Sequence, residues 1–341
     1  MNTLKAIIAF TFIWVCSFTV GHAADVSCDS SIFSDTVLDS DLKHCPYNGI
    51  FIKADNITLD CNGHTISGSR LYNRGGILID ANGVTVKNCT VRDFDFGIMS
   101  SGDTNNHYII SNTAQYNLSF GFNFNAGDGI TLKGNTSQWN DNHGFRLWGL
   151  TNSVIDDNTS MRNGIGIAEV HGFRISFSVG NTFNRNTSHQ NGGHGFRISD
   201  DSNDNTFYQN TSQQNGGHGF RISGSHRNAF NENSSKTNGL QGIDLREGST
   251  ENTFAMNTIA NNAQHGLIIR GGSDGNILTG NVSVNHKDGN GFHVLSSSGN
   301  SLTQNVAINN GNFDLADNSC PTPANVWEDN NFQTAQCEAL Q

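Results

Sequence analysis

A short repeat runs through most of the sequence and limits the fold more than any other feature. Pairs of Asn residues five positions apart recur at steps of 23 or 24 residues, with one step of 28. A period of this length is typical of a solenoid, in which each repeat packs only on its neighbours. The first members of the pairs are Asn112, Asn135, Asn158, Asn186, Asn210, Asn233, Asn257 and Asn305, whereas Asn281 has His286 at the fifth place.

Two apolar columns accompany the Asn pairs. Within each repeat, three short alternating segments are separated by Gly, Asn, Ser and Asp, which predicts three strands per repeat. We therefore expect an all-β right-handed parallel β-helix of about ten coils, with like residues stacked at about 4.8 Å. One column is Ile109, Leu132, Ile155, Phe183, Phe207, Phe230, Phe254, Leu278 and Leu302. The other is Phe122, Phe145, Phe173, Phe196, Phe220, Ile243, Leu267, Phe292 and Phe313.

The recurring Asn residues suit the corners of such a coil. Asn tolerates the left-handed backbone conformation at a sharp turn, and stacked amides can hydrogen-bond from coil to coil. We expect both properties at the Asn columns.

The first residues have the pattern of an export signal. Lys5 precedes an apolar run over 6–20, and small residues follow at Gly21 and Ala23. This predicts a signal peptide over 1–23, cleaved after about Ala23, and a secreted or periplasmic protein. No later stretch approaches about 18 apolar residues, so we expect no membrane insertion.

The cysteines of the mature chain lie near its two ends. An even number in an exported chain indicates disulfides, and we expect Cys28–Cys45 and Cys320–Cys337. Cys61 and Cys89 either pair or remain as buried thiols. We assign 24–55 to an N-terminal cap, 56–317 to the repeats and 318–341 to a C-terminal cap, because an open solenoid end exposes a sheet edge.

Two segments resemble the opening coils of bacterial right-handed β-helix repeat proteins. They are ITLDCNGHTISGS at Ile57–Ser69 and GVTVKNCTVRDFDFGI at Gly83–Ile98. That broad group includes NosD-like periplasmic proteins, mannuronan C5-epimerases and polysaccharide lyases. The resemblance implies a scaffold rather than an activity. The Asp-Pro-His motif of the alginate epimerases is absent, since the prolines are Pro46, Pro321 and Pro323.

The repeated motif HGFRIS places a His and an Arg at the same position of several repeats. It stands at His171–Ser176, His194–Ser199 and His218–Ser223, and HGFRL stands at His143–Leu147. If Phe and Ile point inward along the strand, the Arg between them points outward. This predicts an outward column of Arg146, Arg174, Arg197 and Arg221, continued by Asp244, Ile268, His293 and Asp314. Two residues along the strand, a parallel column contains Trp148, three Ser residues, Arg246 and Arg270.

An acidic polysaccharide could lie along this stripe. One uronate or sulfate would meet one Arg in each coil, because a sugar residue is about as long as the spacing between strands. The alternative is a duplicated Arg that points into solvent. A second column, the His column, lies just before these strands. Its side chains either take part in the site or only cap a turn or stack on one another. Its members are His143, His171, His194, His218, Gln241 and His265.

The 28-residue step inserts about five residues near 165–170, just ahead of His171. Loops that interrupt a solenoid often carry function. This one brings Glu169 near His171 and Arg174, and Trp148 could stack on a sugar. A uronate lyase or epimerase needs a cation, a base and a proton donor. Arg174 or Arg197 would supply the cation, and His171, His194 and Glu169 complete the candidate catalytic set.

The overall charge narrows the class of partner. A net charge of −11 argues against nucleic acid. We expect a monomer without a metal cofactor, with Ca²⁺ at Asp200, Asp201 and Asp204 as the alternative. We therefore predict an exported protein that binds an acidic polysaccharide through the Arg column, with cleavage or epimerisation left open. A non-catalytic scaffold, NosD-like or adhesin-like, is the competing interpretation.

Overall fold

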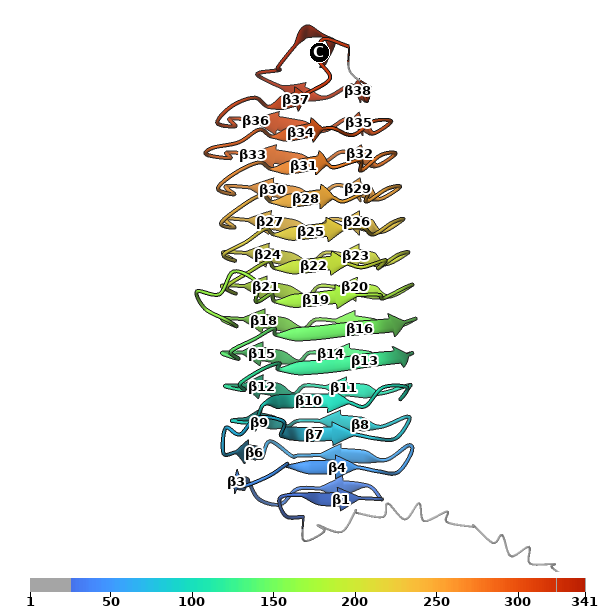
Figure 1. Ribbon diagram of the computed structural model, residues 1–341, viewed down its shortest axis with the longest axis vertical. Coiled ribbons are helices and arrows are strands. Elements are labelled where there is room, and N and C mark those ends of the chain that lie inside the picture. Colours follow the sequence, from blue (N-terminus) through green and yellow to red (C-terminus); the bar gives the residue numbers. More distant parts are fainter. Residues whose placement is uncertain (1–25, 323, 341) are drawn as a thin grey trace, which may run out of the picture.

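The chain winds into one long stack of coils (Figure 1), seen in a computed structural model that describes residues 26–322 and 324–340. The predicted signal peptide lies outside the described residues. Each coil contributes one strand to each of three sheets, and neighbouring strands are parallel throughout. This confirms the parallel β-helix expected from the repeat.

Each sheet contains 13 strands. Sheet A comprises β1 (Ser30–Ile32), β4 (Ile50–Ile52), β7 (Gly75–Ile79), β10 (Phe96–Ser100), β13 (Phe122–Asp128), β16 (Phe145–Thr151), β19 (Phe173–Ser176), β22 (Phe196–Ser199), β25 (Phe220–Ser223), β28 (Ile243–Arg246), β31 (Leu267–Arg270), β34 (Phe292–Leu295) and β37 (Leu315–Asp317). Sheet B comprises β2 (Thr36–Val37), β5 (Thr58–Asp60), β8 (Thr85–Lys87), β11 (Tyr108–Ile110), β14 (Thr131–Lys133), β17 (Val154–Asp156), β20 (Thr182–Asn184), β23 (Thr206–Tyr208), β26 (Ala229–Asn231), β29 (Thr253–Ala255), β32 (Ile277–Thr279), β35 (Ser301–Thr303) and β38 (Val326–Glu328).

Sheet C comprises β3 (Leu42–Cys45), β6 (Thr65–Gly68), β9 (Thr90–Arg92), β12 (Thr113–Gln115), β15 (Thr136–Gln138), β18 (Thr159–Met161), β21 (Thr187–His189), β24 (Thr211–Gln213), β27 (Ser234–Lys236), β30 (Thr258–Ala260), β33 (Val282–Val284), β36 (Val306–Ile308) and β39 (Asn331–Phe332). A short 3-10 helix, η1 (Glu338–Leu340), follows the last strand. Within the part of the chain that the structure describes, no helix has the length and apolar character needed to cross a membrane.

The solenoid is longer than the expected ten or so coils, because both ends contribute strands. β1 to β4 lie within 24–55, and β38 and β39 lie within 318–341, the two segments assigned to caps. The early coils are filled by aliphatic residues such as Ile50, Leu59 and Ile66, all fully buried. They lack the paired Asn and the Phe of later coils, so the repeat is not visible there in the sequence.

Stacked aromatic rings fill the interior. Phe122, Phe145, Phe173, Phe196 and Phe220 stack with centroids 4.7 to 4.8 Å apart. A second stack runs from Phe183 to Phe254 at 4.6 to 4.7 Å. These spacings match the distance between neighbouring strands, so one register serves both the backbone ladders and the side-chain stacks.

Buried Asn residues form ladders along the corners. Asn210, for example, donates its side-chain amide to Asn233 Oδ1 at 3.0 Å and to the Phe183 carbonyl at 2.8 Å. The expected left-handed backbone falls one residue earlier, as at Gln209 (φ 54°), because the Asn amide must point inward to reach the next coil. The ladders include a third series, which was not predicted from the repeat: Asn181, Asn205, Asn228, Asn252, Asn276, Asn300 and Asn325.

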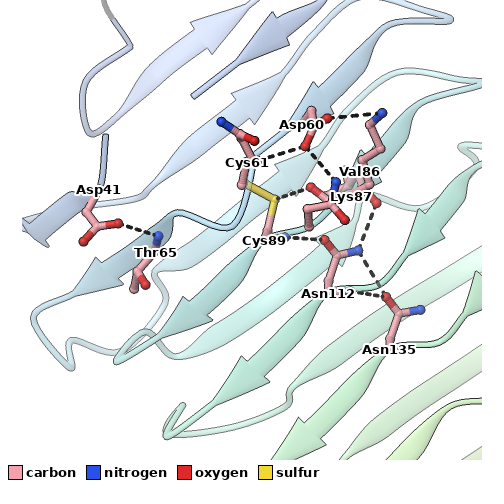
Figure 2. The surroundings of a disulfide bond; sticks show 11 residues. Asp41, Asp60, Cys61, Thr65, Val86, Lys87, Cys89, Asn112 and Asn135 are labelled. Atoms are coloured by element: carbon pink, nitrogen blue, oxygen red, sulfur yellow. Dashed lines mark hydrogen bonds and ion pairs between the residues drawn. A yellow bond between two sulfur atoms is a disulfide. The ribbon is translucent and has the colours of Figure 1, made fainter. Parts of the chain in front are cut away.

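Three disulfides stabilise the ends of the solenoid, two in the N-terminal coils and one near the C-terminus. The expected pairs Cys28–Cys45 and Cys320–Cys337 are present, and Cys61 bonds Cys89, which resolves the alternatives left open for those two residues. Figure 2 shows the Cys61–Cys89 bond beside the start of an Asn ladder. Cys89 donates its backbone N–H to Asn112 Oδ1 at 3.0 Å, so the disulfide continues the ladder toward the N-terminal coils.

Candidate functional site: a basic face on sheet A

Four Arg side chains lie in register on the outer face of sheet A. Arg146, Arg174, Arg197 and Arg221 are consecutive partners in the ladder of β16, β19, β22 and β25. The Phe before each Arg and the Ile or Leu after it are buried in the interior. Because side chains alternate along a strand, the Arg side chains lie on the outside, and the predicted column is confirmed.

The column continues beyond Arg221 as predicted for three coils and then differs. Ala316, not Asp314, follows in register, and Leu315 takes the interior place expected for Phe313. The carboxylate of Asp314 instead accepts the backbone N–H of Gln333 at 2.9 Å, which fixes it within the closing turn. Phe313 is consequently 40% exposed. The three confirmed positions are Asp244, Ile268 and His293.

The His column is a continuous hydrogen-bonded ladder. The rings of His143, His171, His194 and His218 stack with centroids 4.6 to 5.0 Å apart. Each Nδ1 accepts the backbone N–H of the next residue in the column, at 2.9 Å for His143, 3.1 Å for His171 and 3.0 Å for His194. The predicted stacking is therefore present, together with a backbone bond in each coil.

This ladder assigns the hydrogen on each ring. A backbone N–H can only donate, so Nδ1 must be the bare nitrogen and Nε2 carries the hydrogen. Burial, assisted by the neighbouring Arg side chains, lowers the pKa of His143 to about 3, and burial also lowers the pKa of His171 well below its usual 6.5. Burial lowers the pKa of His194 to about 2, with His218 and nearby Arg residues adding to the effect. The column therefore presents neutral rings with outward Nε2–H donors.

Donors from the two columns converge without an acceptor between them. Arg174 Nη1 lies 3.4 Å from His143 Nε2, and Arg221 Nη1 lies 3.3 Å from His194 Nε2. Both atoms of each pair carry hydrogen, so neither contact is a hydrogen bond. The Nε atoms of Arg174, Arg197 and Arg221 are also buried, with no acceptor among the described residues. An oxygen that accepts from both groups would complete each pair.

The Asp244 carboxylate pairs with two guanidinium groups, those of Arg246 and Arg270, at the C-terminal end of the basic face. It accepts Arg270 Nε and Nη2, both at 2.9 Å, and lies 2.8 Å from Arg246 Nη2. His218 Nε2 is 3.4 Å from the same carboxylate. Burial raises the pKa of Asp244 to about 6, although the Arg side chains oppose this. Of the predicted binding residues, Arg246 and Arg270 are thus already paired within the protein.

Aromatic and amide groups hold Arg146 at the other end. Its Nη1 donates to Asn123 Oδ1 at 2.9 Å, and its Cζ lies 5.0 Å from the centre of the Trp148 ring. Trp148 also packs on Phe177, with ring centroids 4.6 Å apart. The indole predicted to stack on a sugar therefore already contacts two side chains. Between these ends, Arg174 and Arg197 form no ion pair with any described residue, whereas Arg221 Nη2 lies 3.8 Å from Glu247 Oε1.

The insertion forms the projecting loop between β18 and β19 (Figure 1). Val170 is buried against Gly164, and its carbonyl accepts the Gly193 N–H at 2.6 Å. This anchor places Glu169 Oε2 3.8 Å from His171 Nε2. The Glu169 side chain is 75% exposed, whereas that of His171 is fully buried.

The candidate catalytic residues are only partly brought together. Glu169 faces His171, as expected from the insertion, but Arg174 contacts His143, and His194 lies one coil beyond His171. The ladder makes both imidazoles donors, so a role as proton acceptor requires a ladder bond to break.

At the predicted calcium turn, Asp204 forms an ion pair with Arg227, with Nε at 2.8 Å and Nη2 at 2.9 Å. Asp200 accepts the Ser199 hydroxyl at 2.9 Å. The described residues contain no cluster of three or more His, Cys, Asp or Glu able to hold a metal. Calcium at this turn remains a prediction.

Known proteins share this architecture. The model of the family described as "Right handed beta helix region" matches residues 19–159, 48–212, 168–284 and 204–332. No curated protein sequence is significantly similar to the chain. Among solved structures, the A-module of the Azotobacter vinelandii mannuronan C-5 epimerase AlgE4 has 16% identity and a TM-score of 0.57, with 91% of each chain covered.

Two further structures have a similar fold. The periplasmic alginate epimerase AlgG has 13% identity and a TM-score of 0.55, over 84% of this chain and 76% of AlgG. The Dettilon tailspike protein has 13% identity and a TM-score of 0.60, over 86% of this chain and 62% of the tailspike. Identities this low establish a shared fold and leave the activity open.

Proposed function

The chain belongs to the right handed beta helix region family. We propose that it is an exported protein that binds an acidic polysaccharide along the outer face of sheet A. Two of the similar structures are epimerases named for alginate or mannuronan. The disulfides suit an oxidising compartment. Secretion or a periplasmic location therefore belongs to the proposal, and a monomeric state remains a prediction.

The observation that carries the proposal is the row of guanidinium groups at Arg174, Arg197 and Arg221, whose buried Nε atoms have no acceptor among the described residues. Guanidinium groups about 5 Å apart repel by roughly 0.8 kcal/mol in water and about 3 kcal/mol at an effective dielectric of 20. The Arg221 side chain is only 15% exposed, so water screens this repulsion incompletely. A bound anion removes the repulsion and supplies the missing acceptors.

The shape of the ligand follows from the shape of the row. The donors recur once per coil along a straight line, which suits an extended polymer with repeated acidic groups. Carboxylates or sulfates on a linear glycan meet this requirement, and a guanidinium binds such planar or multidentate anions with defined geometry.

Catalysis by this face remains a prediction. Arg174 is suited to neutralise a uronate carboxylate, and the Nε2–H groups of His171 and His194 are suited to donate to it. Among the four candidate residues, Glu169 is the carboxylate available to accept a proton. Lyase activity would produce an unsaturated uronate, and epimerisation would exchange the proton at C5.

Titration calorimetry of the mature protein with alginate, pectate and glycosaminoglycans tests the proposal. Arg221→Ala should weaken binding about tenfold, whereas Arg92→Ala, which removes an exposed charge on β9 of sheet C, should not. Ultraviolet absorbance and C5 proton exchange on the same samples report cleavage and epimerisation. If none of these glycans binds, or if the two variants behave alike, the proposal is wrong.

A further inference from the structure

We propose that a pocket at the C-terminal end of the outer face of sheet A binds an uncharged sugar residue. This goes beyond the proposed function, because it requires no acidic group on the ligand. The pocket lies at β34 and β37, near the C-terminal end of the stack (Figure 1). Its volume is about 360 Å³, within the range of about 300 to 1,000 Å³ that is common for ligand pockets. Its lining includes Asn290, His293, Asn312, Phe313, Asn318 and Gln336.

The pocket is uncharged, although it continues the Arg column. His293 stands in that column three coils beyond Arg221, and no Asp, Glu, Lys or Arg is among the described lining residues. Burial lowers the pKa of His293, although its hydrogen bond to Asn318 opposes this, so the ring is neutral at pH 7. The carboxylates of Asp314 and Asp317 are buried and accept hydrogen bonds from the C-terminal residues. A charged ligand group would therefore lose its hydration at the pocket without gaining a counter-charge.

Three amide side chains offer N–H donors to a ligand. Asn290 Oδ1 and Gln336 Oε1 each accept a backbone N–H at 3.0 Å, and Asn318 Oδ1 lies 2.7 Å from His293 Nε2. The NH₂ groups of these amides have no hydrogen-bond partner among the described residues. Asn290 is only 6% exposed, so its NH₂ group is accessible mainly from the pocket. The ligand must therefore bring acceptors, and the hydroxyl, ring or acetamido oxygens of a sugar meet this requirement.

Phe313 supplies an apolar surface beside these donors. Leu315 takes the interior position expected for Phe313, which leaves the Phe313 side chain 40% exposed at the pocket. A sugar ring has C–H groups on its faces and oxygens around its rim. It can therefore pack on an aromatic ring while its oxygens accept from neighbouring amides, a combination typical of small-molecule sites.

The wall formed by the end of the chain is fixed in place. Gln336 precedes Cys337, which bonds to Cys320, and its N–H donates to the Leu315 carbonyl at 3.0 Å. Ala335 forms a β-bridge with Leu315. Because these contacts already position Gln336, a ligand need not order this segment, and the entropy cost of binding is reduced.

Ligand-observed NMR titration of the mature protein with three uncharged probes, chitotetraose, cellotetraose and maltotetraose, tests the proposal. At least one should bind, and Phe313→Ala should weaken that binding about tenfold by removing the apolar contact. Asn312→Ala should weaken it about threefold. The Asn312 side chain is exposed and has no hydrogen bond to any described residue, so this variant should fold as the wild type does.

Phe33→Ala is the matched control, because Phe33 is a 66% exposed Phe near the opposite end of the solenoid, and it should bind the probe as the wild type does. If none of the three probes binds, or if either pocket variant binds as tightly as Phe33→Ala, the inference is overturned. The proposed function is tested separately by acidic glycans and Arg221→Ala, so the failure of one proposal does not decide the other.

Discussion

Replacing His194 with Asn should make the solenoid less sensitive to acid. His194 accepts the His218 backbone N–H through Nδ1 at 3.0 Å. Asn290 performs the same task later in this column, where its Oδ1 accepts the Phe313 N–H at 3.0 Å. The substitution therefore keeps an acceptor in the ladder and removes a group that takes up a proton.

The magnitude follows from the difference in pKa between the two states. Burial lowers the pKa of His194 from 6.5 to about 2 in the folded protein. Below pH 6.5 the unfolded chain binds a proton that the folded chain does not, so the free energy of unfolding falls as the pH drops toward about 2. The loss is about 1.4 kcal/mol per pH unit, or about 2 to 3 kcal/mol between pH 6.5 and about pH 4.5.

Protonation is costly in the folded state for two local reasons. A hydrogen on Nδ1 would oppose the His218 N–H, and the cation would lie among neighbouring Arg side chains such as Arg221 and Arg197. Burial, which is the largest cause of the lowered pKa, adds the cost of removing that charge from water.

Guanidinium unfolding, followed by circular dichroism at a series of pH values, measures the effect. His194→Asn should show a shallower loss of stability between pH 6.5 and about pH 4.5, by about 1.4 kcal/mol per pH unit. His44→Asn changes an exposed histidine outside the column and serves as the control. A slope for His194→Asn equal to that of the wild type would refute the assigned tautomer and the argument built on it.

Three further predictions concern stability at neutral pH. Asp244→Asn should lower the free energy of unfolding by about 2 to 3 kcal/mol, because two guanidinium groups lose their buried counter-charge; an unchanged denaturation midpoint would contradict this. Asn210→Ala should cost about 3 kcal/mol in the same assay, since it leaves buried ladder groups without partners, and a loss below about 0.5 kcal/mol would argue against the ladder. Replacing Cys61 and Cys89 by Ser opens a loop with a sequence separation of 28 and should cost about 3.5 kcal/mol by the loop-entropy relation, whereas equal stability of the variant and the oxidised wild type would show that the bond contributes little.

The repeat was readable from the sequence because each coil must bury the same positions. Phe196 and Ile198 had to point inward, which placed Arg197 outside without any coordinates. The ends were less readable. The first coils bury Ile50 and similar residues with no paired Asn, so their membership in the sheets became visible only through strand pairing.

The candidate site, like the fold, was predicted only in part from the sequence. The sequence by itself determined that Arg and His residues recur in register, because the period of the interior fixes which residues share a column. Only the tertiary structure decided their chemical state, because hydrogen-bond direction and burial depend on the neighbouring coil. Contact with that coil makes the His194 ring a neutral donor, pairs Asp244 with the last Arg residues, and places Arg174 and Arg221 each against the Nε2 of a His residue.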